Sequence, residues 1–211
     1  MITTLRTETE SDYRAVEELT REAFWNLYVP GCDEHYLAHI LRDHPDFIKE
    51  FDFVVECSGK VIGNIMYTRS YVENEKGEKT ETATFGPVSV LPGYQRNGVG
   101  AMLIRHTVRL AREKGYPAVI IYGDPHNYCK HGFKNGKDYN ISSNDGSFPL
   151  GLLVLELKKG FFEGHSWKFY NSPAYEFDKA AAEEFDKRFD PKVKGHKPSQ
   201  DLFSMQCRAH L

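Results

Sequence analysis

Short apolar segments bounded by turn residues are the first pattern along this chain. Ser58-Gly59-Lys60 and the polar stretch 73–79, which has Gly77 near its centre, predict two tight hairpins. Because each hairpin joins two apolar segments, these segments read as consecutive antiparallel strands. The sequence therefore predicts an antiparallel meander in the first half of the chain, formed by strands at residues 51–57, 61–72 and 80–90, with a shorter strand at 2–5.

Three other segments have the 3.6-residue apolar period of an amphipathic helix. The first follows Thr9 and Asp12, which resemble a capping box, and the second covers residues 33–41. The third begins after Gly98 and ends at Gly115, because glycine favours the end of a helix. The apolar side of the first helix consists of Tyr13, Val16, Leu19, Ala23 and Phe24.

Residues 118–122, AVIIY, are almost entirely apolar, which is typical of a central strand buried on both faces. A strand, a loop, a helix and another strand form a right-handed crossover, so strands 80–90 and 118–122 should be parallel neighbours. Residues 150–157 predict a further strand that completes the sheet. The pattern as a whole predicts an α/β (α+β) fold with a mixed central sheet and flanking helices.

The chain becomes rich in aromatic residues beyond position 160. Residues 167–170, WKFY, alternate as a strand does, and a four-residue aromatic repeat predicts a helix that ends at Pro191. We interpret this aromatic stripe as a docking face rather than a ligand box. The sequence thus divides into a domain at 1–160 and a C-terminal extension at 161–211 that packs on the same domain.

Composition limits the kind of partner that this protein has. The chain has 211 residues and is 40% hydrophobic, which is enough for one well-packed core. Its formal net charge is -3, whereas binding to a nucleic acid backbone requires a basic face, so we expect no nucleic acid partner. There is no apolar signal region and no apolar run of membrane-spanning length, so we expect a cytoplasmic protein without a membrane partner. The four cysteines lack Cys-x-x-Cys spacing, which disfavours a zinc site or a disulfide framework. The oligomeric state stays open, with a homodimer among the alternatives.

Residues 88–101, VSVLPGYQRNGVGA, pass from a strand through a Pro-Gly bend into the start of a helix. Such a junction directs unpaired backbone N–H groups and the positive end of a helix dipole at one point, which suits a polyphosphate. Gly98 and Gly100 let the backbone approach a ligand closely, and Arg96 adds a positive charge. The segment lacks the Gly-Lys-Ser/Thr of a P-loop, and Leu103 stands where a dinucleotide fingerprint needs its third glycine.

Two motifs in this region resemble those of the GNAT acyltransferase superfamily. Gln-Arg-x-Gly-x-Gly-Ala at 95–101 is similar to its acetyl-CoA pyrophosphate loop, and Tyr128-x-x-x-Gly132-Phe133 is similar to the element that closes its cofactor site. The preceding Gly-Asp-Pro at 123–125 resembles a bacterial branch of predicted acetyltransferases. The resemblance covers residues 1–160. It implies a GNAT fold with a splayed parallel pair of strands, acetyl-CoA as co-substrate, and no metal.

The resemblance also implies the site residues. Tyr128 would stand beside the sulphur of CoA and act as general acid, since a phenol with a pKa of about 10 stays protonated at neutral pH. The alternative role is that of a packing tyrosine. The main chain near Val88 and Val90 would polarise the thioester carbonyl and pair with the pantetheine amides. The full set of expected cofactor-binding residues is Val88, Ser89, Val90, Gln95, Arg96, Asn97, Gly98, Val99, Gly100, Ala101, Asn127 and Tyr128.

The general base and the acceptor are not identified by the sequence. Many relatives have a glutamate on the strand before the phosphate loop, but residues 82–90 contain no carboxylate. Four side chains, or a chain of water molecules, are left as alternatives for the base: Glu22, Glu34, His35 and His126. Phe24, Trp25, Tyr28 and Tyr36 either grip an acceptor or belong to the core.

Two functions follow from these observations. The first is direct transfer of an acetyl or other short acyl group from acetyl-CoA to an amine, which is either a small molecule or a group on a peptide or protein. The second is a non-catalytic acyl-CoA sensor or interaction module. The missing strand carboxylate and the long extension keep the second function open.

Overall fold

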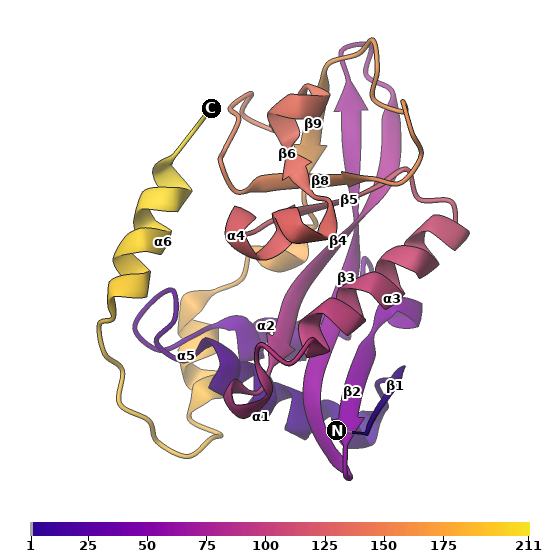
Figure 1. Ribbon diagram of the computed structural model, residues 1–211. Coiled ribbons are helices and arrows are strands. Elements are labelled where there is room, and N and C mark those ends of the chain that lie inside the picture. Colours follow the sequence, from indigo (N-terminus) through magenta and orange to yellow (C-terminus); the bar gives the residue numbers. More distant parts are fainter. Residues whose placement is uncertain (1) are drawn as a thin grey trace.

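The computed structural model describes residues 2–211, and a mixed β-sheet runs through the centre of the molecule (Figure 1). Strands β4 and β5 are parallel, and the other neighbouring strands on the main path of the sheet are antiparallel. The predicted meander and the predicted parallel pair are therefore both confirmed. The strand order is β1 (Thr3–Thr7), β2 (Phe53–Cys57), β3 (Lys60–Asn74), β4 (Lys79–Val90), β5 (Ala118–Tyr122), β8 (Leu152–Glu156) and β6 (Lys134–Asn135).

Two more strands extend the sheet beyond this path. Strand β9 (Trp167–Tyr170) pairs antiparallel with β3 and parallel with β7 (Ile141–Ser143). Trp167 and Phe169 are buried in a cluster with Val72 of β3, and the rings of Tyr71 and Tyr170 stack with centroids 4.7 Å apart. The aromatic run after residue 160 thus contributes a strand to the sheet. The boundary at residue 160 itself stays a prediction.

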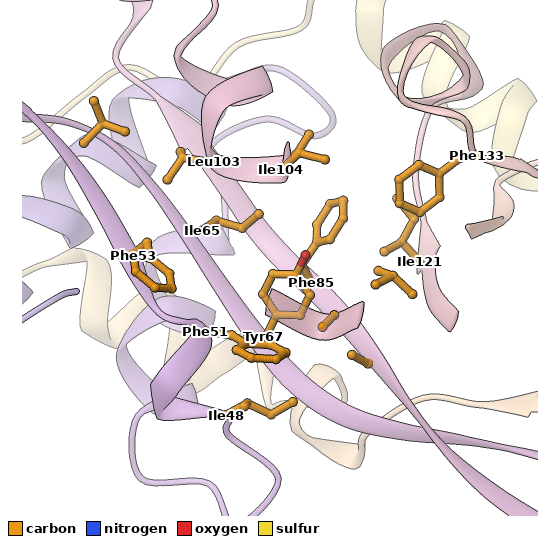
Figure 2. Close-up of a cluster of buried hydrophobic side chains, with 14 of the residues drawn as sticks. Ile48, Phe51, Phe53, Ile65, Tyr67, Phe85, Leu103, Ile104, Ile121 and Phe133 are labelled. Atoms are coloured by element: carbon orange, nitrogen blue, oxygen red, sulfur yellow. The ribbon is translucent and has the colours of Figure 1, made fainter. Parts of the chain in front are cut away.

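Helices cover both faces of the sheet (Figure 1). Because successive side chains of a strand point to opposite faces, neighbouring residues of β3 contact different helices. Tyr67 donates or accepts a hydrogen bond with Thr107 of α3 (Val99–Glu113) at 2.9 Å, whereas Met66 packs against Leu37 and Leu41 of α2 (Glu34–Leu41). Helix α1 (Tyr13–Phe24) lies on the same face as α2. Figure 2 shows the apolar cluster on the α3 side of the sheet.

The capping box predicted before α1 is present. The 3₁₀ turn η1 (Glu10–Asp12) precedes this helix, and the Asp12 carboxylate accepts a hydrogen bond from the backbone N–H of Thr9 at 2.9 Å. The remaining short elements are η2 (Lys49–Phe51), η3 (Pro92–Tyr94), α4 (Pro125–Tyr128), η4 (Cys129–His131), η5 (Gly136–Tyr139) and η6 (Pro173–Tyr175).

Two helices form the C-terminal part of the chain. Helix α5 (Lys179–Asp186) carries Phe185, and Phe189 follows it; both rings pack against His35 of α2, at 5.6 and 5.1 Å between centroids. Two rings of the predicted aromatic stripe, Phe185 and Phe189, therefore contact α2. Helix α6 (Pro198–Arg208) has no counterpart among the predicted elements. No helix within residues 2–211 combines the length and the apolar character that crossing a bilayer requires.

Candidate active site

Strands β4 and β5 separate beyond a single point of contact. Within the described residues, their parallel pairing consists of Ala83 opposite Val119. The register of β4 against β3 then shifts, because Ile65 pairs with Val88 but Tyr67 pairs with Phe85. This shift is a β-bulge, which bends a strand. Beyond Ala83, β4 therefore leaves β5, and the splayed parallel pair that the sequence predicted is confirmed.

The last residues of β4 present their main chain to this opening. Val88, Ser89 and Val90 pair with β3 on one edge, and alternate N–H and C=O groups of a strand point to its other edge. The Ser89 side chain is directed elsewhere, since its hydroxyl donates to Thr20 Oγ1 of α1 at 3.0 Å. Side-chain identity at these three positions consequently matters little for a ligand in the opening.

The predicted anion-binding loop lies between β4 and α3. Arg96 and Gly98 have φ angles of 62° and 84°, in the left-handed region that glycine tolerates best. The carbonyl of Gly98 accepts the first hydrogen bond of the helix, from the Met102 N–H at 2.9 Å. The preceding helical amides, those of Val99, Gly100 and Ala101, therefore come before the first intrahelical hydrogen bond and are available to a ligand.

Two side chains fix the shape of this loop. The Gln95 amide donates to the carbonyl of Val90 at 3.1 Å, and the Asn97 amide donates to the carbonyl of Gln95 at 3.2 Å. Arg96 is exposed. Gln95 and Asn97 thus hold the loop by bonds to its own backbone, while the Arg96 side chain is free to reach a ligand in solvent.

Positive charge gathers between α3 and the segment after α4. The pKa of His131 lies below its ordinary value, because burial and the nearby charges of Lys130 and Arg105 all disfavour a further positive charge. With the positive end of the α3 dipole, these groups make the region favourable for an anion.

Tyr128 stands where β4 and β5 diverge. The Asp124 carboxylate caps α4 by accepting the His126 N–H at 2.9 Å, and the Tyr128 ring packs close over Gly123. A Cβ atom on residue 123 would lie 2.5 Å from Cε2 of this ring. Its centroid is 5.6 Å from that of Phe85, which belongs to the cluster in Figure 2.

Burial raises the pKa of Tyr128 well above its ordinary value, and the nearby Tyr28 and Asp124 raise it further. The phenol therefore carries its proton throughout the neutral range, as a general acid must. Asn127, the residue beside it, is exposed. Its backbone N–H donates to the carbonyl of Asp124 at 2.9 Å.

The four side chains considered for the general base have different surroundings. Glu22 accepts a hydrogen bond from Lys192 at 2.7 Å, and His126 is exposed. His35 is fully buried 3.0 Å from Asp186, and burial lowers its pKa to about 4. Glu34 is partly buried, and burial raises its pKa to about 7.

C-terminal segments cover the aromatic residues of the α1–α2 region. The ring of Tyr28 packs against that of Phe203 in α6, with 4.5 Å between centroids, and Tyr36 packs against Phe177 and Phe185 at 5.5 Å. The side-chain amide of Gln206 donates to the carbonyl of Gly123 at 3.2 Å. The sequence did not predict these contacts of Phe203 and Gln206. The one clear sequence signal for α6 is Pro198, which occupies the first turn of this helix.

The remaining titratable groups do not assemble into a metal centre. Among residues 2–211, no three His, Cys, Asp or Glu side chains converge as metal ligands would. Cys129, next to Tyr128, is an exposed free thiol, and Cys32 is a buried one.

Curated proteins similar to this chain are bacterial. Over 76 residues it is 34% identical to the uncharacterized N-acetyltransferase YjhQ of Escherichia coli K12, a match that covers 36% of this chain and 41% of YjhQ. Over 137 residues it is 27% identical to the uncharacterized N-acetyltransferase YhbS of the same strain, which covers 65% of this chain and 77% of YhbS. The chain thus spans less than half of YjhQ and about three quarters of YhbS.

Solved structures show the same fold. The complex of the GNAT family N-acetyltransferase YhbS from Escherichia coli with CoA has a TM-score of 0.71 at 21% identity, covering 83% of this chain and 92% of that one. A GNAT family acetyltransferase from Brucella melitensis in complex with acetyl-CoA has a TM-score of 0.64 at 23% identity, covering 82% and 98%. Residues 13–133, more than half of the chain, match the family model described as acetyltransferase (GNAT) family. The chain therefore belongs to the GNAT acetyltransferase family.

Proposed function

We propose that this protein transfers an acetyl or other short acyl group from acetyl-CoA directly to an amine. One observation carries the proposal: the opening between β4 and β5 has the free amides of α3 at one end and Tyr128 beside it. The relatives solved with CoA and acetyl-CoA support the choice of co-substrate. The acceptor is a small-molecule amine or an amine of a peptide or protein.

The cofactor is held mainly by backbone groups. Its diphosphate accepts hydrogen bonds from the amides of Val99, Gly100 and Ala101, and Arg96 adds a charge-assisted contact. Its pantetheine arm pairs with Val88–Val90 as an added strand. This arrangement directs the thioester toward Tyr128.

The transfer itself requires three events at the thioester. A neutral amine attacks the carbonyl carbon, a backbone N–H of β4 stabilises the negative charge that develops on the carbonyl oxygen, and the departing thiolate receives a proton. Tyr128 gives this proton. Its position between Gly123 and Phe85 fixes the ring, so that little further ordering is needed during the reaction.

The test combines calorimetry with CoA and a thiol-release assay with acetyl-CoA and a set of amines. Exchange of Tyr128→Phe should lower turnover by roughly ten to ten-thousand fold while the Kd for CoA is kept, since only the proton donor is lost. Tyr170→Phe is the matched control, because this phenol lies on β9, stacked on Tyr71. Absence of CoA binding by the wild-type protein would refute the proposed function.

A second function, an acyl-CoA sensor without catalysis, is favoured by the lack of a carboxylate at positions 82–90 of β4. It predicts binding of CoA with no release of thiol in the presence of any amine. The same two assays therefore separate the two functions.

A further inference from the structure

Glu34 differs from the buried acidic side chains that pair with an arginine. Arg42 pairs with Glu8 at 2.8 Å and with Glu17 at 3.2 Å, and Arg6 pairs with Asp12 at 2.7 Å. Among residues 2–211, no lysine, arginine or histidine forms such a pair with Glu34, whose carboxylate accepts the backbone N–H of Asp33 at 3.1 Å.

An unpaired carboxylate away from bulk water attracts a cation from outside the protein. Asp52 also has no direct cation, but it is 5% exposed, lies beside Glu8 in the interior, and accepts a hydrogen bond from Asn64 at 3.1 Å. Glu34, by contrast, is partly exposed, so a ligand can reach its carboxylate.

The contacts of α6 connect the surroundings of Glu34 to those of Tyr128. Phe203 packs on Tyr28, and one turn later Gln206 donates to the carbonyl of Gly123, over which the Tyr128 ring lies. The backbone of α6 thus bridges the loop after α1 and the loop before α4. Figure 1 shows α6 running beside both of these regions.

Electrostatic effects agree with this geometry. Burial raises the pKa of Tyr28 to about 12, and the charges of Glu34 and Asp124 contribute to the shift. Tyr28 in turn raises the pKa of Tyr128. Tyr28 is therefore close enough to both Glu34 and Tyr128 for their charges to interact.

We propose that Glu34 binds the ammonium form of the acceptor and removes its proton, with the rings of Tyr28 and Phe203 beside the bound amine. This inference rests on the proposed transferase function and deepens it. A carboxylate with aromatic rings nearby suits a primary ammonium group on an apolar or aromatic stem. The acceptor class is therefore an amine cation rather than an alcohol or a thiol.

The protons and electrons of the step balance. The ammonium group gives one proton to Glu34, which later releases it to solvent, and the nitrogen lone pair then forms the N–C bond. As the C–S bond breaks, its electron pair stays on sulphur, and Tyr128 donates a proton to the thiolate. The nitrogen loses its second proton, which restores Tyr128, and the products are the amide, free CoA and one proton.

The direct test compares Glu34→Gln with the wild-type protein in thiol release from acetyl-CoA. The amines are butylamine, phenethylamine and spermidine. Loss of a general base should lower kcat/KM for the amine by roughly a hundred- to ten-thousand-fold, while the Kd for CoA is unchanged. Glu34→Asp should restore part of the activity. Glu184→Gln is the matched control, because its side chain on α5 is 72% exposed and pairs with Lys187 at the surface.

The pH profile separates a base from a merely structural residue. In the wild-type protein, kcat/KM should rise with pH up to about 7, the pKa to which burial raises Glu34, and this rise should vanish in Glu34→Gln. The other titratable groups facing Glu34, namely Tyr28, Cys32 and Asp33, stay in place in the variant, so they do not account for the loss.

Equal activity and equal pH profiles of Glu34→Gln and the wild type overturn the proposed role of Glu34 as general base. The transferase function still stands in that case if Tyr128→Phe is impaired. If no amine reacts, carbon-13 NMR of the Glu34 carboxylate in the CoA-loaded protein decides. Addition of phenethylamine should then lower the apparent pKa of Glu34, and an unchanged titration curve refutes the proposal. Failure to bind CoA refutes the proposed function instead.

Discussion

Glu17 and Glu34 lie on neighbouring helices, α1 and α2, yet their carboxylates have opposite surroundings. Glu17 accepts hydrogen bonds from His39 at 2.8 Å and Arg42 at 3.2 Å, which join the two helices. Within residues 2–211, Glu34 accepts hydrogen bonds from backbone N–H groups of its own turn and forms no ion pair. The charge of Glu17 is used to hold the fold together, whereas that of Glu34 remains available to a ligand. Burial of an acid therefore indicates function only when its partners are known.

Among the variants that test this difference between Glu17 and Glu34, Arg42→Met should have the largest effect, on the stability of the fold. The exchange leaves Glu8 and Glu17 without their shared guanidinium group, and breaking a buried ion pair typically lowers the free energy of unfolding by about 3–5 kcal/mol. Urea denaturation measures this change. Arg109→Met is the control, since the exposed pair of Arg109 with Glu113 should contribute only about 0–1 kcal/mol. Similar losses in both variants would contradict a structural role for Glu17.

Gly123→Ala should have the next largest effect, through the ring of Tyr128. The new methyl group would lie 2.5 Å from Cε2 of Tyr128 and displace the ring. A misplacement of about 1 Å lowers turnover by roughly a hundredfold. Turnover in the thiol-release assay measures the loss, and Gly93→Ala is the control because a Cβ there meets open space. Full activity of Gly123→Ala would show that the ring position does not matter.

The stability of Glu34→Gln should respond to pH in the direction opposite to that of Glu17→Gln. In the folded chain, burial raises the pKa of Glu34 to about 7, so the carboxyl group keeps its proton below that pH. In the unfolded chain, the same group loses its proton near the ordinary glutamate pKa of about 4.3. Native stability therefore falls as pH rises between these values.

A glutamine does not ionise, so Glu34→Gln should be more stable than the wild type by roughly 1–2 kcal/mol at pH 8 and show no such gain at pH 4. Glu17→Gln, which loses its ion pairs, should be less stable at pH 8. Denaturation curves at both pH values measure the difference. A loss of stability in both variants at pH 8 would erase the contrast between the two carboxylates.

The smallest effect is expected from Phe203→Ala. Removing one of the two rings beside the proposed amine site should raise the KM for the amine by about tenfold, without a change in the Kd for CoA. Steady-state kinetics with phenethylamine measures this shift. The neighbouring Leu202→Ala is the control, since Leu202 is 67% exposed. An equal KM in both variants would separate α6 from the acceptor side.

The fold of the proposed cofactor loop could be predicted because its signals are local. A strand, a bend, two glycines and a helix start all fall within residues 88–101, and the hairpins at 58–60 and 73–79 fix the order of the meander. Main-chain groups dominate this side, so the backbone path alone defines it. The positions of Gln95 to Ala101 then follow from the start of α3.

The proposed acceptor side could not be predicted because it depends on contacts between distant segments. Glu34 was one of four alternatives, and only the structure shows that Arg42 pairs with Glu8 and Glu17 while Glu34 has no ion pair within residues 2–211. The contacts of Phe203 and Gln206 depend on α6, a helix with little apolar periodicity, in which Leu202 and Met205 are exposed. Apolar periodicity does not locate such a helix, because polar side chains, Gln200 and Gln206, make part of its contacts.

The free edge of β4 beyond Ala83 determines which substitutions proteins with this fold can accept during evolution. Because main-chain groups face the opening between β4 and β5, another apolar residue at Val88 or Val90 leaves the available hydrogen-bonding groups unchanged. Proline at either position would delete an N–H group and stiffen the strand. Neutral variation should therefore accumulate at these sites among apolar residues, while selection removes proline.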